Sequence, residues 1–204
     1  LFTTLSGAGY GLLIWTGALI LMPYLQGRVP TQVFLPVLWA LMLLLGLALT
    51  TIGLLSSMFH LGKPARAWRA FSQWRTSWLS REGVSAVLTA LPVLALLGVV
   101  ATVFATQSFA VLHGAVVPVL AASLVLLSFA TVVCTAMIYA CLKPVPAWRH
   151  RLVLPVYLVF ALLSGWMVLM AVANWTALSD AALGVVVLVS FTLAAIAAVL
   201  ELLY

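Results

Sequence analysis

The sequence predicts an all-α integral membrane protein, a bundle of about six transmembrane helices with a short interfacial helix between the second and the third. Composition is the first reason: 66% of the 204 residues are hydrophobic and 6% are charged, whereas a water-soluble domain needs far more charge to cover its surface. The second reason is the length of the apolar runs, because a bilayer core of about 30 Å requires about 20 apolar residues per helix. The third is that the basic residues gather in two connections, as they do beside transmembrane helices.

Six apolar runs satisfy this length, at about 3–24, 33–58, 84–106, 111–142, 152–173 and 182–203. Glycine, proline and polar residues separate them, at 26–30, 60–82, 107–108, 143–146 and 174–180. We interpret 1–204 as a single transmembrane domain. Because the chain starts and stops within apolar stretches, at Leu1 and Tyr204, we expect it to be part of a longer protein, truncated at both ends.

Charge predicts the topology. Of the nine Lys and Arg residues, the connection 60–82 holds five and the connection 143–151 holds three, which leaves Arg28 on the opposite side. The positive-inside rule then places both connections of this multi-pass protein in the cytoplasm. The net charge of +6 is too small and too local to indicate nucleic acid, so we expect the lipid bilayer and no nucleic acid as partner. The basic connection alternatively serves to dock an acidic partner.

The connection 60–82 is the concentrated polar segment of the chain. His60 falls at the membrane end of the second helix, which Pro64 helps to stop. Residues 65–75 alternate small or apolar residues with basic ones at helical spacing, which predicts a short interfacial helix. Ser80 is the expected N-cap of the third helix, so that Glu82 lies in its first turn, where the helix dipole favours a carboxylate.

His60 and Glu82 are the candidate catalytic pair, because ionisable residues at membrane depth are costly and indicate function. The imidazole of His60 can hydrogen-bond a quinone oxygen and exchange a proton near neutral pH, and the carboxylate of Glu82 can relay that proton to water. Arg66 is a secondary candidate, since a fixed cation beside Glu82 keeps it ionised. The structural alternative is an interfacial histidine and a carboxylate that merely pairs with Arg81 or Arg75.

The remaining polar residues give weaker signals. Tyr139, near the end of the fourth helix, either borders a quinone pocket or belongs to the interfacial aromatic belt. His113 and His150 do not lie at matching depth on facing helices, so we predict no haem. Cys134 and Cys141 lie seven positions apart on one helix, and no cluster of metal-ligand spacing occurs. We therefore predict quinone or quinol as the cofactor and no metal in this chain.

Four segments of the chain resemble the membrane anchor subunits of the dimethyl sulfoxide reductase family. Residues 59–71 read F-H-L-G-K-P-A-R-A-W-R-A-F and residues 76–82 read T-S-W-L-S-R-E. The looser matches are T-T-L-S-G-A-G-Y-G at 3–11 and M-I-Y-A-C-L-K-P at 137–144. The family is usually described with eight membrane helices, so the resemblance implies that the last two lie outside this chain.

The resemblance implies a location in the bacterial inner (cytoplasmic) membrane, a function and partners. It implies that His60 and Glu82 bear on quinol binding, and that the anchor binds a four-cluster iron–sulfur subunit and a molybdopterin catalytic subunit, which carry the metals. With these partners, the basic and aromatic residues of the connection 60–82 are expected at a protein interface: Arg66, Arg69, Trp74 and Arg75. Cytoplasmic basic connections favour the anchor of cytoplasm-facing sulfite:quinone oxidoreductase complexes. The alternatives are the anchor of a dimethyl sulfoxide reductase, or a transporter or structural anchor without redox function.

Overall fold

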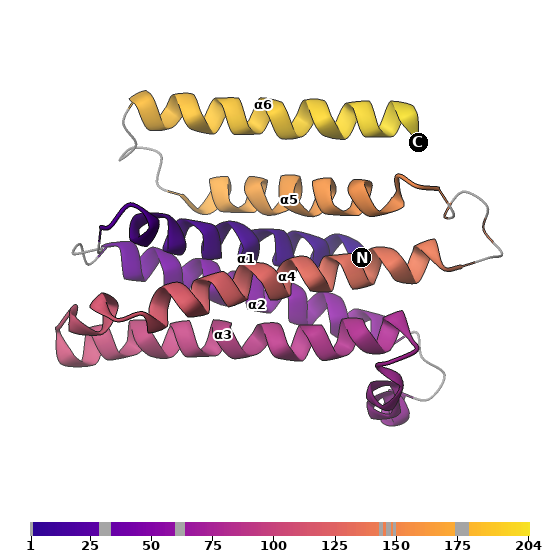
Figure 1. Cartoon of the computed structure of the whole chain (residues 1–204), viewed down its shortest axis with the longest axis horizontal. Helices are drawn as coiled ribbons and strands as arrows, with labels where there is room; N and C mark the ends of the chain where they lie inside the picture. Colours follow the sequence, from indigo (N-terminus) through magenta and orange to yellow (C-terminus); the bar gives the residue numbers. More distant parts are fainter. Residues whose placement is uncertain are drawn as a thin grey trace.

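The computed structural model describes residues 2–28, 34–59, 64–142, 145, 148, 150–173 and 180–204, with side chains left out at 2, 34, 64–67, 70 and 180–183. The elements follow in the order α1 Phe2–Leu25, α2 Phe34–Met58, η1 Pro64–Gln73, α3 Trp78–Thr106, η2 Ala110–His113, α4 Val116–Ala140, α5 Val153–Val172 and α6 Asp180–Leu203. The α-helices run side by side along one axis (Figure 1), and six of them are long and apolar enough to cross a membrane. The predicted all-α membrane bundle is confirmed, and the described residues contain no strand.

The predicted start of the third helix is wrong. Helix α3 begins at Trp78 rather than at 84, and its N-cap is Ser77 rather than Ser80. Ser77 has the extended backbone of an N-cap, and its side chain accepts a hydrogen bond from the Ser80 amide at 3.5 Å. Glu82 therefore lies in the second turn of α3, beyond the turn where the helix dipole acts most strongly.

The predicted fourth helix is divided in two. Residues 110–113 form the separate 3₁₀ helix η2, and α4 starts at Val116. Gly114 caps η2 with an extended backbone, φ −81° and ψ 160°, which interrupts the helical course of the chain. The other four predicted helices agree with the observed bounds to within two residues.

Helix α1 is the centre of the bundle and contacts α2, α4 and α5. Its crossing with α5 is the tightest: a Cβ at Gly11 would overlap the carbonyl of Ala161, and a Cβ at Gly165 would overlap the Gly11 backbone. Small residues allow such approach between membrane helices. Gly7 and Gly11 form a G-x-x-x-G pair in α1, but only Gly11 serves packing in this way, because a Cβ at Gly7 would have no neighbour within 4 Å.

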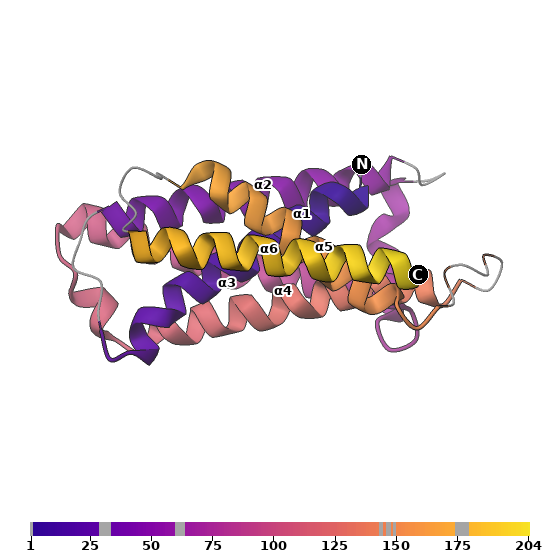
Figure 2. The same cartoon turned by 90° about the horizontal axis from the view of Figure 1, so that it is seen from above.

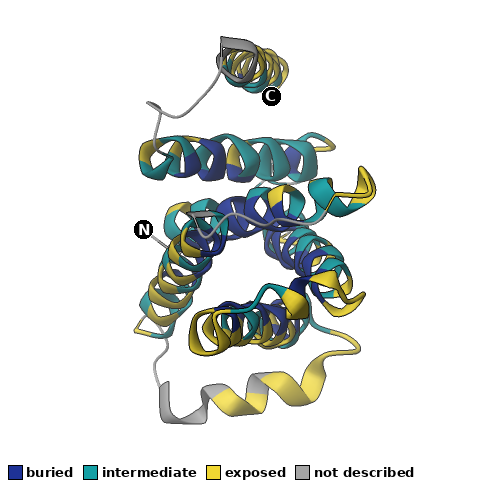
Figure 3. Ribbon diagram, turned by 90° about the vertical axis from the view of Figure 1, so that its left-hand side faces the viewer, coloured by how far each residue is buried: buried dark blue, intermediate teal, exposed yellow. Residues whose placement is uncertain are grey.

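Two elements lie outside this central group. Helix α6 packs on α5 and crosses it on the outside of the bundle (Figure 2), and most of its coloured surface is exposed or half-buried (Figure 3). Element η1 lies on the opposite side of the bundle, beside the start of α3, and runs transverse to the long helices (Figures 1 and 3). Phe71 of η1 rests on α3, since a Cβ at Gly83 would lie 3.1 Å from its ring.

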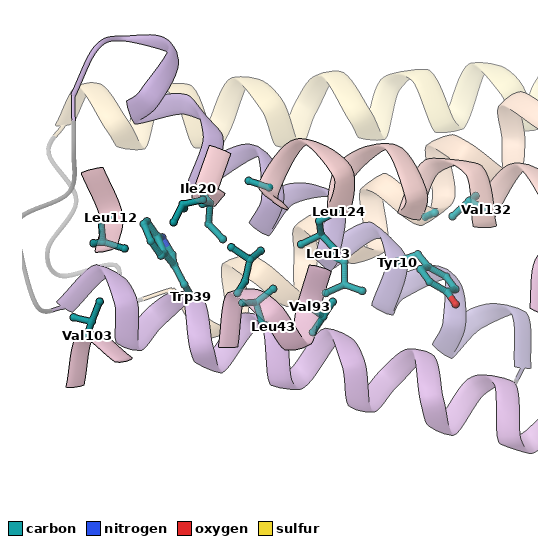
Figure 4. Packing of buried hydrophobic residues seen from close by; sticks show 14 residues of the cluster. Tyr10, Leu13, Ile20, Trp39, Leu43, Val93, Val103, Leu112, Leu124 and Val132 are labelled. Carbon is teal, nitrogen blue, oxygen red and sulfur yellow. The ribbon is translucent and has the colours of Figure 1, made fainter. Parts of the chain in front are cut away.

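The buried side chains between α1, α2, α3 and α4 are apolar over most of the bundle's length. Figure 4 shows this cluster running from Leu112 and Trp39 at one end, through Leu13, to Tyr10 at the other. The Tyr24 hydroxyl closes the first end by donating to the Leu112 carbonyl oxygen at 2.9 Å. Polar side chains gather at the second end, which is also the end where η1 lies.

Candidate functional site

Glu82 points into the bundle. Its side chain is 3% exposed, although it lies one helical turn from the polar connection. The Thr135 hydroxyl of α4 contacts its Oε1 atom at 2.5 Å. In the described part of the chain no Lys or Arg side chain pairs with Glu82. A buried carboxyl held by a neutral hydroxyl, rather than by a cation, is an expensive arrangement in an apolar protein and so indicates function.

A row of buried hydroxyls continues from Glu82 along the interface of α3 and α4. We call it the hydroxyl seam, and its members are Ser85, Thr89, Ser128, Thr131 and Thr135. On α3, the Ser85 hydroxyl donates to the Glu82 carbonyl oxygen at 3.0 Å. Across the interface, the hydroxyls of Thr89 and Thr131 lie 3.3 Å apart. Side chains at intervals of three or four residues share one helix face, which is why these residues meet.

A cavity of about 280 Å³ lies between the first half of α1, the second half of α4 and the first half of α5. Its wall includes Gly7, Tyr10, Thr135, Tyr157, Phe160 and Ser164. We call it the α1/α4/α5 cavity. An apolar cavity of roughly 150 Å³ holds benzene, so this cavity accommodates one substituted six-membered ring. Seven of the twelve residues that line it carry a hydroxyl and the others are apolar, and small-molecule sites combine apolar walls with polar groups that orient the ligand.

Tyr10 separates this cavity from a second one. Its side chain is 2% exposed and lines both the α1/α4/α5 cavity and a cavity of about 250 Å³ between α1, α2 and α3. The Tyr10 hydroxyl has no hydrogen-bond partner among the described residues. Buried tyrosine hydroxyls usually find a partner, so an unpaired one at a cavity wall is available to a ligand.

Tyr139 does not line the α1/α4/α5 cavity itself but packs against a residue that does. It is half-buried, and its ring stacks on Tyr157 with 5.4 Å between centroids. Trp148 packs edge-on against the other side of Tyr139 at 5.1 Å. Tyr157 belongs to the cavity wall, whereas Tyr139 does not. Tyr139 thus supports a wall residue and also belongs to an aromatic cluster near the end of the helices.

The basic side chains of the connection that the structure describes, those of Arg69, Arg75 and Arg81, contact tryptophans rather than Glu82. The guanidinium groups of Arg69 and Arg75 each lie 5.6 Å from a neighbouring indole centroid, of Trp68 and Trp74 respectively. Arg69, Trp74 and Arg75 are exposed. Arg66 lies in η1, with its side chain outside the description. Cation–π pairs at exposed sites contribute about 0.5–1 kcal/mol each.

Arg81 has a structural task. Its guanidinium donates to the carbonyl oxygens of Trp74 at 3.0 Å and of Arg75 at 2.7 Å, and it lies 4.3 Å from the Trp78 ring centroid. It thereby fastens the end of the connection to the start of α3. The described side chains of Arg81 and Arg75 do not pair with Glu82, which is hydrogen-bonded to Thr135 instead.

Of the predicted site residues, the structure places Glu82 beside a cavity, whereas His60 lies outside the described residues. Sequence reasoning missed Thr135 and Tyr10. A signal for Thr135 exists: Ser128, Thr131 and Thr135 form a polar line at helical spacing within an otherwise apolar helix. Tyr10 gives no such signal, because tyrosine is ordinary in a membrane helix.

Comparisons with known proteins agree with the resemblance. The family described as DMSO reductase anchor subunit (DmsC) matches residues 1–204. A protein named as the C subunit of a sulfite dehydrogenase, from Allochromatium vinosum, is 38% identical over 184 residues, which cover 81% of this chain and 51% of that protein. The chain thus spans about half the length of this curated relative. No solved structure matches the chain.

Proposed function

We propose, from the premise that the chain belongs to the DMSO reductase anchor subunit (DmsC) family, that it is the membrane anchor and quinone-binding subunit of a heterotrimeric molybdopterin oxidoreductase. In this proposal electrons pass between the membrane quinone pool and a four-cluster iron–sulfur subunit. The observation that carries the proposal is the α1/α4/α5 cavity, which is large enough for one substituted ring. Thr135 belongs to its wall and is hydrogen-bonded to Glu82.

The quinone ring occupies the α1/α4/α5 cavity in this proposal. A quinone needs hydrogen-bond donors for its two oxygens and an exchange of protons when it is reduced or oxidised. The unpaired Tyr10 hydroxyl supplies a donor at the wall, and Glu82 supplies a carboxyl behind Thr135. His60, which follows α2 in the sequence, is the proposed second proton-exchanging group, and Arg66 and Tyr139 are proposed to border the site.

The iron–sulfur subunit is proposed to bind over η1 and the start of α3. Arg69, Trp74 and Arg75 are exposed there, and Arg66 belongs to the same element. Tryptophan and arginine are enriched where proteins bind one another. Substitution of Arg69 and Arg75 by Glu should detach the extrinsic subunits from washed membranes, and retention of the full complex by this double variant would argue against the interface.

Sulfite is the proposed substrate of the catalytic subunit, with dimethyl sulfoxide as the alternative. The 38% identity to a protein named as part of a sulfite dehydrogenase supports sulfite. The distribution of Lys and Arg also supports it, since eight of the nine lie in two connections on one side and so favour a cytoplasm-facing complex. Reporter fusions after Arg69 and after Arg151 should report the cytoplasm, and one after Asn174 the outside. Periplasmic signals from the first two would favour the dimethyl sulfoxide alternative.

The test of the function is turnover by the complete complex in native membranes. Wild-type membranes should reduce a short-chain ubiquinone analogue when supplied with sulfite, and should not oxidise a quinol when supplied with dimethyl sulfoxide. His60→Ala should lower quinone-linked turnover about tenfold or more, because it removes a hydrogen bond of about 0.5–1.5 kcal/mol, or more if charged, together with a proton-exchanging group. Sulfite oxidation with a soluble acceptor such as ferricyanide should persist. Equal loss of both activities, or of neither, would refute the assignment of His60.

A further inference from the structure

Thr135 has one hydroxyl proton and two acceptors for it. Its Oγ1 atom lies 2.5 Å from Oε1 of Glu82 and 3.0 Å from the Thr131 carbonyl oxygen, one turn back in α4. A threonine hydroxyl donates one hydrogen bond and accepts up to two. Both contacts cannot be full hydrogen bonds donated by Thr135 at the same time, so the pair has two arrangements.

The two arrangements correspond to the two protonation states of Glu82. When the carboxylate is charged, the Thr135 hydroxyl donates to Oε1. When the carboxyl is protonated, its O–H donates to Oγ1 of Thr135, and the Thr135 hydroxyl turns to the Thr131 carbonyl oxygen, the back-bond usual for threonine in helices. Glu82 therefore keeps a hydrogen-bond partner in both states, and the change needs only a rotation of one hydroxyl.

Thr135 is also where Glu82 meets the α1/α4/α5 cavity. Thr135 belongs to the cavity wall, whereas Glu82 does not. Among the described residues, no other wall residue is hydrogen-bonded to the Glu82 side chain. Two other hydroxyls of the seam, those of Thr89 and Thr131, contact one another. Neither residue lines this cavity.

We propose that Thr135 is the proton relay between a quinone oxygen in the α1/α4/α5 cavity and the Glu82 carboxylate. The inference rests on the proposed function and adds the residue through which the proton passes. When quinol is oxidised, the quinol O–H bond breaks and its proton goes to Oγ1 of Thr135. The Thr135 proton moves to Oε1 of Glu82 in the same step.

Quinol oxidation releases two electrons and two protons. The electrons go one at a time to the clusters of the iron–sulfur subunit, and the proton of the second quinol oxygen goes to water. Thr135 ends with one proton, now directed at the Thr131 carbonyl oxygen, and Glu82 ends protonated. Quinone reduction is the same sequence in reverse, with Glu82 as the proton source.

The experiment compares Thr135→Val with Thr135→Ser in the complete complex in native membranes. Valine keeps the shape of threonine but has no hydroxyl, whereas serine keeps the hydroxyl. Positioned proton transfer contributes roughly 10²- to 10⁴-fold to rates, so kcat for a short-chain ubiquinone analogue should fall at least about tenfold in Thr135→Val. The KM should change much less, and Thr135→Ser should stay within about twofold of wild type.

Thr89→Val is the matched control. Thr89 lies on α3 in the same hydroxyl seam, is buried and loses the same hydroxyl, yet does not line the α1/α4/α5 cavity. Its quinone-linked kcat should stay near that of wild type. The solvent deuterium isotope effect on kcat should rise in Thr135→Val alone. The double variant that combines Thr135→Val with Glu82→Gln should have a quinone-linked kcat no lower than that of Glu82→Gln alone, because the effects of two groups on one proton path are not additive.

Two results would overturn the relay while leaving quinone binding in place. One is a Thr135→Val complex with wild-type quinone-linked kcat. The other is a Thr135→Ser complex as slow as Thr135→Val, which would show that the hydroxyl is not the group required. If the wild-type complex oxidises sulfite with ferricyanide but never reduces the quinone analogue, the proposed function itself fails and the relay with it.

Discussion

Small residues serve opposite purposes at different points along α1. From Gly9 onward they allow close contact: a Cβ at Gly17 would lie 2.7 Å from Cγ2 of Val125 and 3.1 Å from the Ala121 carbonyl oxygen, so α1 and α4 touch. Near the start of the helix, a Cβ at Gly7 would meet nothing within 4 Å, and Gly7 lines the α1/α4/α5 cavity instead. One helix thus closes the bundle at one end and leaves it hollow at the other.

The polar residues follow the same division. Glu82, Thr135 and Tyr10 lie at the hollow end, while the closed end contains Ile20, Trp39 and Leu112 (Figure 4). A packed apolar end has no room for a ligand, and a cavity without polar groups has no proton chemistry. Space and the buried carboxyl coincide where α1 carries Gly7, which is why we place the function there.

The largest expected effect is on the closed part of α1. Gly11→Val would force a side chain into the α5 backbone at Ala161, and overpacking of flexible side chains alone typically costs about 1–3 kcal/mol. Because backbone atoms cannot turn aside, we expect the complex to be lost from membranes. Gly98→Val is the control, since a Cβ at Gly98 meets nothing within 4 Å. Native gel electrophoresis measures the assembled complex; normal assembly of Gly11→Val would disprove the tight crossing.

The next effect concerns chemistry at the hollow end. Glu82→Gln keeps the size of the side chain and an oxygen for Thr135, but removes the proton-exchanging carboxyl. Because general acid–base groups contribute roughly 10²- to 10⁴-fold, quinone-linked turnover should fall about a hundredfold. Assembly and sulfite oxidation with ferricyanide should be unchanged at equal amounts of complex. Loss of both activities together would mean that Glu82 is structural.

A smaller effect is expected from filling the cavity. Gly7→Val adds an isopropyl group at the cavity wall, where a Cβ would meet nothing within 4 Å, so folding should tolerate it. A mismatch of about one methylene in a pocket changes binding by roughly 1–3 kcal/mol, and we expect the KM for the quinone analogue to rise about tenfold. Gly98→Val again serves as the control. An unchanged KM in Gly7→Val would place the quinone outside this cavity.

The smallest effects belong to the hydroxyl seam. The Ser128 hydroxyl is buried and has no hydrogen-bond partner in the described structure, so Ser128→Ala should leave thermal stability unchanged or slightly higher. Thr131→Val breaks the contact with Thr89 and should lower stability by about 0.6 kcal/mol, the average for hydrogen bonds between membrane helices. Thermal unfolding in detergent measures both variants. A clear loss of stability in Ser128→Ala would mean that its hydroxyl is paired.

Sequence reasoning predicted the helices and part of the site for different reasons. Long apolar runs predict spanning helices directly, because the bilayer sets their length. The exact start of α3 was not predictable from the candidate cap Ser80, because the choice of Ser77 depends on Arg81 binding the carbonyl oxygens of Trp74 and Arg75. Glu82 was recognisable from its chemistry alone, since so few acidic residues occur in the chain.

By itself, the sequence determined that the protein lies in a membrane, the number and order of its spanning helices, and its family. It also identified Glu82 as a candidate site residue. These depend on composition, run length and local motifs, which need no knowledge of neighbours in space. The tertiary structure decided that Thr135 faces Glu82, that Gly7 leaves a hollow while Gly11 and Gly17 close one, and that Tyr10 stands at the cavity wall. These depend on which faces of α1, α3, α4 and α5 meet, and helices that are apolar on every side give almost no sign in sequence of which face turns inward.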